Sequence, residues 1–166
     1  MIKKKILISV FLIFLCSTIS FGQEKPIWIT SLENHLKQKE TDWKIERKTE
    51  FASLNGAYNY SFILKSGKYQ VSILIMKLPD GNRVEKAVEN AFAKMVDLFS
   101  KGIYKNAKRA KIENFGDEGF IWTDLKIDDL PRTMMLFRKQ DVFVQINTPS
   151  EEITKKFARY IFERMP

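Results

Sequence analysis

Two neighbouring apolar runs near the end of the chain constrain the fold most, because each run is apolar on both of its faces. Thr133–Phe137 and Val142–Ile146 are short, rich in β-branched, aromatic and methionine side chains, and separated by a polar turn at 139–141. This pattern predicts a β-hairpin. Successive side chains of a strand point to opposite faces, so Met134 and Met135 lie on opposite sides of the sheet. Both sides then need cover, and the sequence predicts helices on both.

A helix is expected directly after this hairpin. Thr148 offers a capping hydroxyl, Pro149 tolerates the loss of an N–H at a helix start, and Glu151 follows Thr148 at the spacing of a capping box. An apolar stripe then recurs at helical spacing. Its members are Ile153, Phe157, Tyr160, Ile161 and Met165.

The rest of the mature chain is read as further hairpins and two more helices. Thr30 and Glu33 are spaced as a capping box that opens a first helix, and Asn55-Gly56 is a strong turn signal between two strands. The other expected elements are an edge strand over 43–54, a strand over 57–64, a central strand over 69–76, a helix over 82–100, strands over 112–115 and 120–123, and a polar loop over 124–131. The predicted fold is α+β, a three-layer α/β/α sandwich with a mostly antiparallel sheet of six or seven strands built from hairpins.

The first 22 residues have the pattern of a signal peptide, and residues 23–166 are predicted to form a single α+β domain. Lys3, Lys4 and Lys5 precede an unbroken apolar run over 6–16, and Ser20-Phe21-Gly22 supplies small residues before Gln23. The apolar run is shorter than the ~20 residues of a spanning helix, which disfavours an uncleaved anchor. Lipidation at Cys16 is an alternative, although Leu15 does not fit the lipoprotein pattern. Cleavage after Gly22 is therefore expected, with no transmembrane segment remaining.

Removal of this leader leaves 144 residues and removes the only cysteine, Cys16, so disulfides and thiol catalysis are excluded from the mature domain. Losing three lysines lowers the net charge from +8 to +5. For an exported protein, a mildly basic charge favours anionic surfaces of the cell envelope over nucleic acid. No cofactor is expected, and the oligomeric state is left open.

The sequence contains few combinations of side chains that could form a catalytic site. His35 is the only histidine, so zinc sites and the usual histidine-based triads have too few side chains. Two pairs of acids, Asp117 with Glu118 and Asp128 with Asp129, fall in expected loops, where paired carboxylates could act as acid and base in a hydrolase. These four are the alternative acidic site. A calcium loop that also uses Asp124 is disfavoured, because the spacing lacks the required pattern and glycine.

A basic run is the clearest feature outside the expected core. Its cations follow one another without an intervening acid, and Tyr104 is its only aromatic residue. They are Lys101, Lys105, Lys108, Arg109 and Lys111. One interpretation is contact with anionic headgroups or an acidic partner. The other, which we favour, is a solvated helix end and strand, where cations also suit the helix C-terminus.

The segment Gly116-Asp117-Glu118-Gly119-Phe120, followed by 136–144 and a closing helix, resembles the C-terminal half of small exported bacterial proteins with a PsbP-like fold. The resemblance covers roughly a third of the chain. It implies an antiparallel sheet between helices and a binding or assembly role, and it carries over no catalytic residues.

Together these features predict a periplasmic or secreted protein that is not an enzyme. We expect a binding or accessory module of the bacterial cell envelope, whose partner is an envelope protein, a lipid or a small apolar ligand. The alternative is a hydrolase that uses the loop carboxylates.

Overall fold

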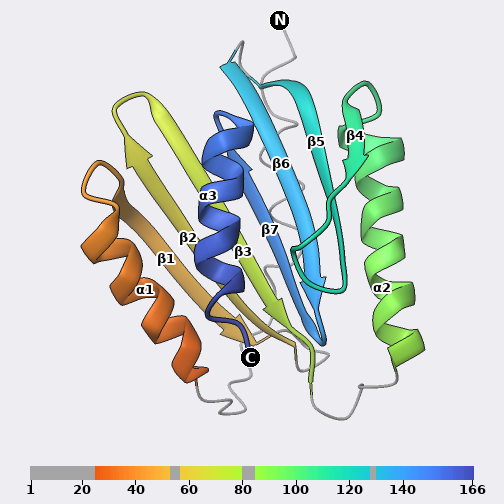
Figure 1. Cartoon of the computed structure of the whole chain (residues 1–166), viewed down its shortest axis with the longest axis horizontal. Helices are drawn as coiled ribbons and strands as arrows, with labels where there is room; N and C mark the ends of the chain where they lie inside the picture. The colour runs from red at the N-terminus through yellow and green to blue at the C-terminus, as the bar shows by residue number, and fades with distance from the viewer. Residues whose placement is uncertain (1–24, 53–56, 80–84, 128–129) are drawn as a thin grey trace, which may run out of the picture.

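The computed structural model describes residues 25–52, 57–79, 85–127 and 130–166, which contain three α-helices, one π-helical turn and seven strands (Figure 1). In chain order these are α1 (Ile27–Lys39), β1 (Lys44–Ala52), β2 (Tyr58–Ser66), β3 (Tyr69–Lys77), α2 (Glu85–Leu98), the π-helical turn Phe99–Ile103, β4 (Lys108–Lys111), β5 (Glu118–Ile127), β6 (Leu130–Lys139), β7 (Val142–Thr148) and α3 (Glu151–Phe162). The strands form one antiparallel sheet in the order β1-β2-β3-β7-β6-β5-β4. The predicted α+β fold is confirmed.

Tight turns join the strands of the two central hairpins. β2 and β3 are joined through Gly67, whose φ is 56°, and β6 and β7 through Gln140, whose φ is 51°. Positive φ at such turns matches the twist of the flanking strands. Lys139, expected within the second turn, instead pairs with Val142 as the last residue of β6. Pairing of β3 with β7 joins the two hairpins into one continuous sheet.

One face of the sheet is covered by two helices, α1 and α3, which lie side by side in front of it in Figure 1. The buried side chains of this layer come from alternate strand positions and from the inner sides of both helices. They include Tyr60, Phe62 and Leu64 of β2, Val71, Ile73 and Ile75 of β3, Val144 and Ile146 of β7, Leu32 and Leu36 of α1, and Phe157 and Ile161 of α3. The closing helix therefore buries the stripe that its sequence predicts.

The opposite face carries a second core, packed beneath α2. Val88, Phe92 and Val96 of α2 lie against large side chains of β5, β6 and β7, among them Trp122 and Phe143. Met134 belongs to this core and Met135 to the first, as the alternation of strand side chains requires. The predicted three layers are therefore present.

The second core does not extend across the whole of this face. Phe51 of β1, Ile63 of β2 and Leu74 of β3 belong to neither core and are half-buried. Tyr60, Phe62 and Leu64 of β2 face α1 and α3, so the alternate residues of β2, including Ile63, face the side of α2. Phe51 and Leu74 lie on that side as well, because they pair with Asn59 and Ser61 of β2. Within the described residues, the core beneath α2 is formed mainly by β5, β6 and β7 and reaches β3 at Met76.

The predicted start of the closing helix is wrong by two residues. Ser150, not Thr148, is the N-cap, and its side chain accepts a hydrogen bond from the backbone N of Ile153 at 3.3 Å. Thr148 instead ends β7, where its hydroxyl lies 2.6 Å from that of Thr154 and donates to the carbonyl of Ser150. Thr148 is fully buried, and a buried hydroxyl needs a hydrogen-bond partner. Thr154 and the carbonyl of Ser150 supply that partner inside the core, so Thr148 does not serve as a helix cap.

The predicted capping box of the first helix is also wrong. α1 begins at Ile27 after Pro26, so Thr30 and Glu33 both lie inside the helix. Glu33 faces the sheet and binds the hydroxyl of Tyr60 at 3.0 Å rather than reaching back to a backbone N–H. A carboxylate with strong partners across the core gains more from them than from a cap.

Two further corrections concern β4 and β5. The expected strand over 112–115 is absent, because positive φ at Asn114 and Gly116 turns the chain there, and the strand lies at Lys108–Lys111 instead. All four residues of β4 are exposed, which an edge strand tolerates, since its charges remain in water. The expected loop over 124–131 is mostly strand, because a bulge with Asp124 at φ 60° lets β5 continue to Ile127. The Asn55-Gly56 turn lies outside the described residues.

Candidate basic surface

The basic run lies at the edge of the sheet where α2 ends and β4 begins. Lys101 is in the π-helical turn that continues α2, Lys105 is in the turn that follows, and the other three cations are in β4. A π-helical turn is rare and is often found at functional sites. Figure 1 shows β4 beside α2 at this edge.

Strand alternation divides the run between two faces of the sheet. Lys108 pairs with Thr123 and points toward the face of α1 and α3, whereas Arg109 and Lys111 pair with Trp122 and Phe120 on the face of α2. Lys108 binds Asp124 at 2.8 Å, and this hydrogen bond raises the pKa of its ammonium group. The structure therefore does not place Lys108 with the other four cations.

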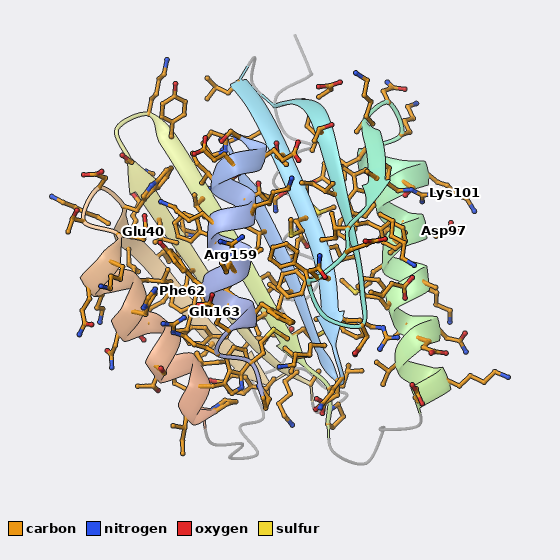
Figure 2. All side chains as sticks on the ribbon, viewed as in Figure 1. Glu40, Phe62, Asp97, Lys101, Arg159 and Glu163 are labelled. Carbon is orange, nitrogen blue, oxygen red and sulfur yellow. The ribbon has the colours of Figure 1, made fainter. Side chains whose placement is uncertain are left out.

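Two residues that the sequence did not single out complete the arrangement. Lys94 and Leu98, on α2, line a shallow depression together with Asp97, Lys101 and Gly102. Leu98 is 61% exposed, an unusual position for a large apolar side chain. Figure 2 shows Asp97 and Lys101 on the outer side of α2, away from the sheet, where they form an ion pair of 2.6 Å.

We call this region the basic surface. Its exposed cations are Lys94, Lys101, Lys105, Arg109 and Lys111, and two of them, Lys94 and Lys101, line the depression with Leu98 and Asp97. Five cations thus face solvent, and Asp97 forms an ion pair with one of them, Lys101. The sequence could have indicated Lys94 and Leu98 only through a helical wheel of α2 that showed which residues lie on its solvent-facing side.

Buried aromatic rings fix the basic surface from below. Nη1 of Arg109 donates to the hydroxyl of Ser100 at 3.0 Å, and its guanidinium lies 5.3 Å from the centre of the Phe120 ring. Phe99 stacks on Tyr104 at 5.6 Å and contacts Trp122 edge-on. Burial raises the pKa of the Tyr104 hydroxyl, which therefore stays neutral beneath the cations. The backbone that carries the cations is held in place by a packed core.

The acidic residues of the alternative site are only partly described. Asp117 accepts hydrogen bonds from the backbone N of Gln140 at 2.6 Å and from Nη1 of Arg138 at 3.4 Å. Glu118 lies 3.8 Å from Nε of the same arginine, whose side chain is 9% exposed. Glu89 of α2 approaches it to 3.7 Å. Asp117 and Glu118 therefore surround one buried guanidinium.

The other pair of that site, Asp128 and Asp129, lies outside the described residues, so the structure does not place it against Asp117. Among the described residues no group of three or more His, Cys, Asp or Glu side chains is placed to hold a metal ion. In the same part of the chain, no helix combines the length and apolarity needed to cross a bilayer.

His35 lines a second shallow depression, on the outer side of α1. Its Nδ1 lies 2.6 Å from a guanidinium nitrogen of Arg164, so the neutral ring accepts this hydrogen bond. Burial and the charge of Arg164 lower the pKa of His35. The ring also packs edge-on against Tyr160 at 4.7 Å. These contacts describe a histidine that joins α1 to the end of α3.

The basic surface thus combines exposed charge, an exposed apolar side chain and a packed aromatic floor. Known proteins add no precedent for it. A scan against protein-family models, a search of curated proteins and a search of solved structures each found no match.

Proposed function

We propose that this chain is an exported, non-catalytic binding module of the bacterial cell envelope, and that it contacts an anionic partner through the basic surface. The observation that carries the proposal is the exposure of five cations where α2 ends and β4 begins, two of which, Lys94 and Lys101, line one depression with the exposed Leu98. Concentrated positive charge attracts anionic partners and speeds their association. Leu98, exposed between Lys94 and Lys101, adds apolar contact area that charge alone lacks.

Export is supported by the N-terminal sequence. Lys3, Lys4 and Lys5, the apolar run over 6–16 and the small residues Ser20 and Gly22 are the features that the export machinery reads. The proposed location is the periplasm or the exterior of the cell, where anionic envelope components are abundant.

A non-catalytic role is supported by the surroundings of the candidate catalytic groups. His35 is bound to Arg164, and Asp117 and Glu118 are engaged with Arg138 and the backbone of the β6–β7 turn. Carboxylates that neutralise a buried guanidinium contribute to stability, and losing them would leave an unpaired charge. The resemblance to PsbP-like proteins points to the same kind of role.

The test is a comparison of three baits in an envelope extract. The wild-type protein, the triple variant Lys94→Glu/Lys105→Glu/Lys111→Glu and a control of equal charge, Lys39→Glu/Lys68→Glu/Lys155→Glu, are immobilised at equal density. All six lysines are exposed, and the control lysines lie on α1, in the β2–β3 turn and on α3. We expect wild type and control to retain the same acidic component and the first variant to lose it.

Two results would contradict the proposal. In one, all three baits retain the same material. In the other, both triple variants lose it equally, which would show a response to total charge rather than to the basic surface. Melting temperatures of the three proteins establish that each is folded.

A further inference from the structure

We propose that the partner of the basic surface is an anionic lipid bilayer, on which the protein docks reversibly with Leu98 entering the headgroup region. This inference rests on the proposed function and names its partner. The position of Leu98, the shape of the surface and the predominance of lysine among its cations all favour a bilayer.

Leu98 stands between cations on the same side of the helix. Lys94 precedes it by one turn, Lys101 follows it in the π-helical turn, and all three line one depression. Leu98 is 61% exposed, and the side of α2 that meets the sheet is formed by Val88, Phe92 and Val96. The leucine therefore points away from the core and contributes nothing to it.

The shape of this region suits a bilayer better than a folded protein. The depression is shallow and sits on the outer surface of a helix, so it offers no groove for a peptide. At Gly102 a Cβ would meet nothing within 4 Å, so the backbone is open to approach. A protein partner would need a surface that packs closely against this one, whereas lipid headgroups rearrange around the side chains that approach them.

The cations are also of the kind that lipid surfaces accept. Four of the five are lysines, whose long apolar stems lie along a membrane surface while the ammonium groups reach the phosphates. Protein interfaces instead favour arginine and aromatic side chains at their centres. Here the one arginine, Arg109, is bound to Ser100 and lies over Phe120.

The strength of such docking follows from the charges. Each lysine near an anionic surface strengthens binding about fivefold, so removing three weakens it about a hundredfold. One leucine supplies too little apolar area for stable anchoring without the charges. We therefore expect binding that requires anionic lipid, weakens as salt is raised and depends on Leu98 as well as on the lysines.

The experiment uses the exported protein and vesicles of two compositions, equimolar phosphatidylglycerol and phosphatidylcholine, or phosphatidylcholine alone. Co-sedimentation is measured for wild type, for Lys94→Glu/Lys105→Glu/Lys111→Glu, for the control Lys39→Glu/Lys68→Glu/Lys155→Glu and for Leu98→Ser. We expect wild type to bind only the anionic vesicles. The first triple variant should bind at least about a hundredfold more weakly, because Lys→Glu reverses each charge and does not merely remove it. The control triple should lose much less, because charges beyond about 8 Å are screened at physiological salt.

A second readout reports the position of residue 98 directly. Cys16 is the only cysteine and is removed with residues 1–22, so Leu98→Cys and Lys155→Cys each place a polarity-sensitive fluorophore at one position of the exported protein. We expect a blue shift on anionic vesicles for the probe at 98 and none for the probe at 155. Equal shifts at both positions, or a Leu98→Ser variant that binds as tightly as wild type, would overturn the proposed docking.

The outcomes also separate this inference from the function on which it rests. If wild type binds neither kind of vesicle but still retains an acidic protein through Lys94, Lys105 and Lys111, the lipid inference fails and the proposed function stands. If substitution of these lysines changes neither binding to vesicles nor retention of material from the extract, both proposals fail. Equal binding to the two kinds of vesicle would likewise exclude an electrostatic dock.

Discussion

The hydroxyl of Tyr60 donates a hydrogen bond of 3.0 Å to Glu33 and thereby joins β2 to the inner side of α1. Glu33 is only 5% exposed, and the ammonium groups of Lys25, Lys37 and Lys48 lie 2.8 to 3.0 Å from its carboxylate. Burial raises the pKa of Glu33, but these four donors outweigh burial and hold it far below the ordinary value of 4.5. Burial and the bond to Glu33 raise the pKa of Tyr60. The buried carboxylate is therefore charged in the folded protein at neutral and mildly acidic pH.

The first prediction is that Glu33 stabilises the fold in a pH-dependent way. Its pKa is lower in the folded than in the unfolded chain, so its contribution is complete above about pH 4.5 and is lost as the pH falls. Glu33→Gln should lower the free energy of unfolding by about 1–3 kcal/mol near neutral pH. The difference between wild type and variant should shrink toward pH 3. Denaturant melts across this range measure it.

Glu152→Gln is the matched control, because Glu152 lies exposed in the first turn of α3. Its effect should stay within about 0.5 kcal/mol at every pH. If the two variants show the same pH dependence, the assignment of the acid sensitivity to Glu33 is wrong.

The second prediction concerns the closing helix. Phe157 is fully buried and meets the rings of Trp43 and Tyr160 edge-on at 6.0 and 6.1 Å. Phe157→Ala leaves a cavity among these rings and should lower the free energy of unfolding by about 3–5 kcal/mol. Lys155→Ala, on the exposed side of the same helix, should change it by no more than about 0.5 kcal/mol. Equal denaturant midpoints for the two variants would contradict this packing.

Much of the architecture was predictable, because the residues that the sequence pattern places on apolar faces are the residues that the core buries. Met134 and Met135 adjoin in a strand and enter different cores, so two apolar faces did predict two helical layers. Phe157 and Ile161 recur at helical spacing and are buried together. Here secondary structure and burial follow from side-chain periodicity alone, which a single sequence contains.

What could not be predicted depends on contacts between distant segments. Glu33 reads locally as a capping residue, and only the partner Tyr60, 27 residues away, shows why it is buried. The bulge at Asp124 turned an expected loop into paired strand, because pairing with β6 outweighs a polar local sequence. The basic run reads as one stretch, yet pairing of β4 with β5 sends Lys108 away from Arg109. The candidate site therefore emerged only from the register of the sheet and the outer face of α2.

The third prediction is that export removes residues 1–22. The basic start, the apolar run and the small residues Ser20 and Gly22 meet the requirements of cleavage before Gln23. Intact-mass measurement of the exported protein should give the mass of residues 23–166. A chain that begins at an acylated Cys16, or one that keeps residues 1–22, would show that this reading of the leader is wrong.

The fourth prediction is that Gly116 cannot be replaced by alanine. Gly116 has a φ of 80°, and a Cβ built there would lie 2.0 Å from the carbonyl oxygen of Arg138. That oxygen accepts a hydrogen bond from the backbone N of Asp117 at 2.9 Å, so the two segments cannot separate without breaking it. Gly116→Ala combines unfavourable backbone torsion with a steric clash and should lower the free energy of unfolding by more than about 2 kcal/mol.

Gly102 provides the comparison, since a Cβ there would meet nothing within 4 Å and its φ lies outside the left-handed region. Gly102→Ala should stay within about 0.5 kcal/mol of wild type or gain slightly, because alanine favours helical backbone. Chemical denaturation of both variants gives the two free energies. The close approach of Gly116 to β6 also holds Asp117 beside Arg138, so Gly116→Ala should weaken that contact as well. An alanine at 116 that costs no more than the one at 102 would mean that the turn before β5 is not held against β6 as described.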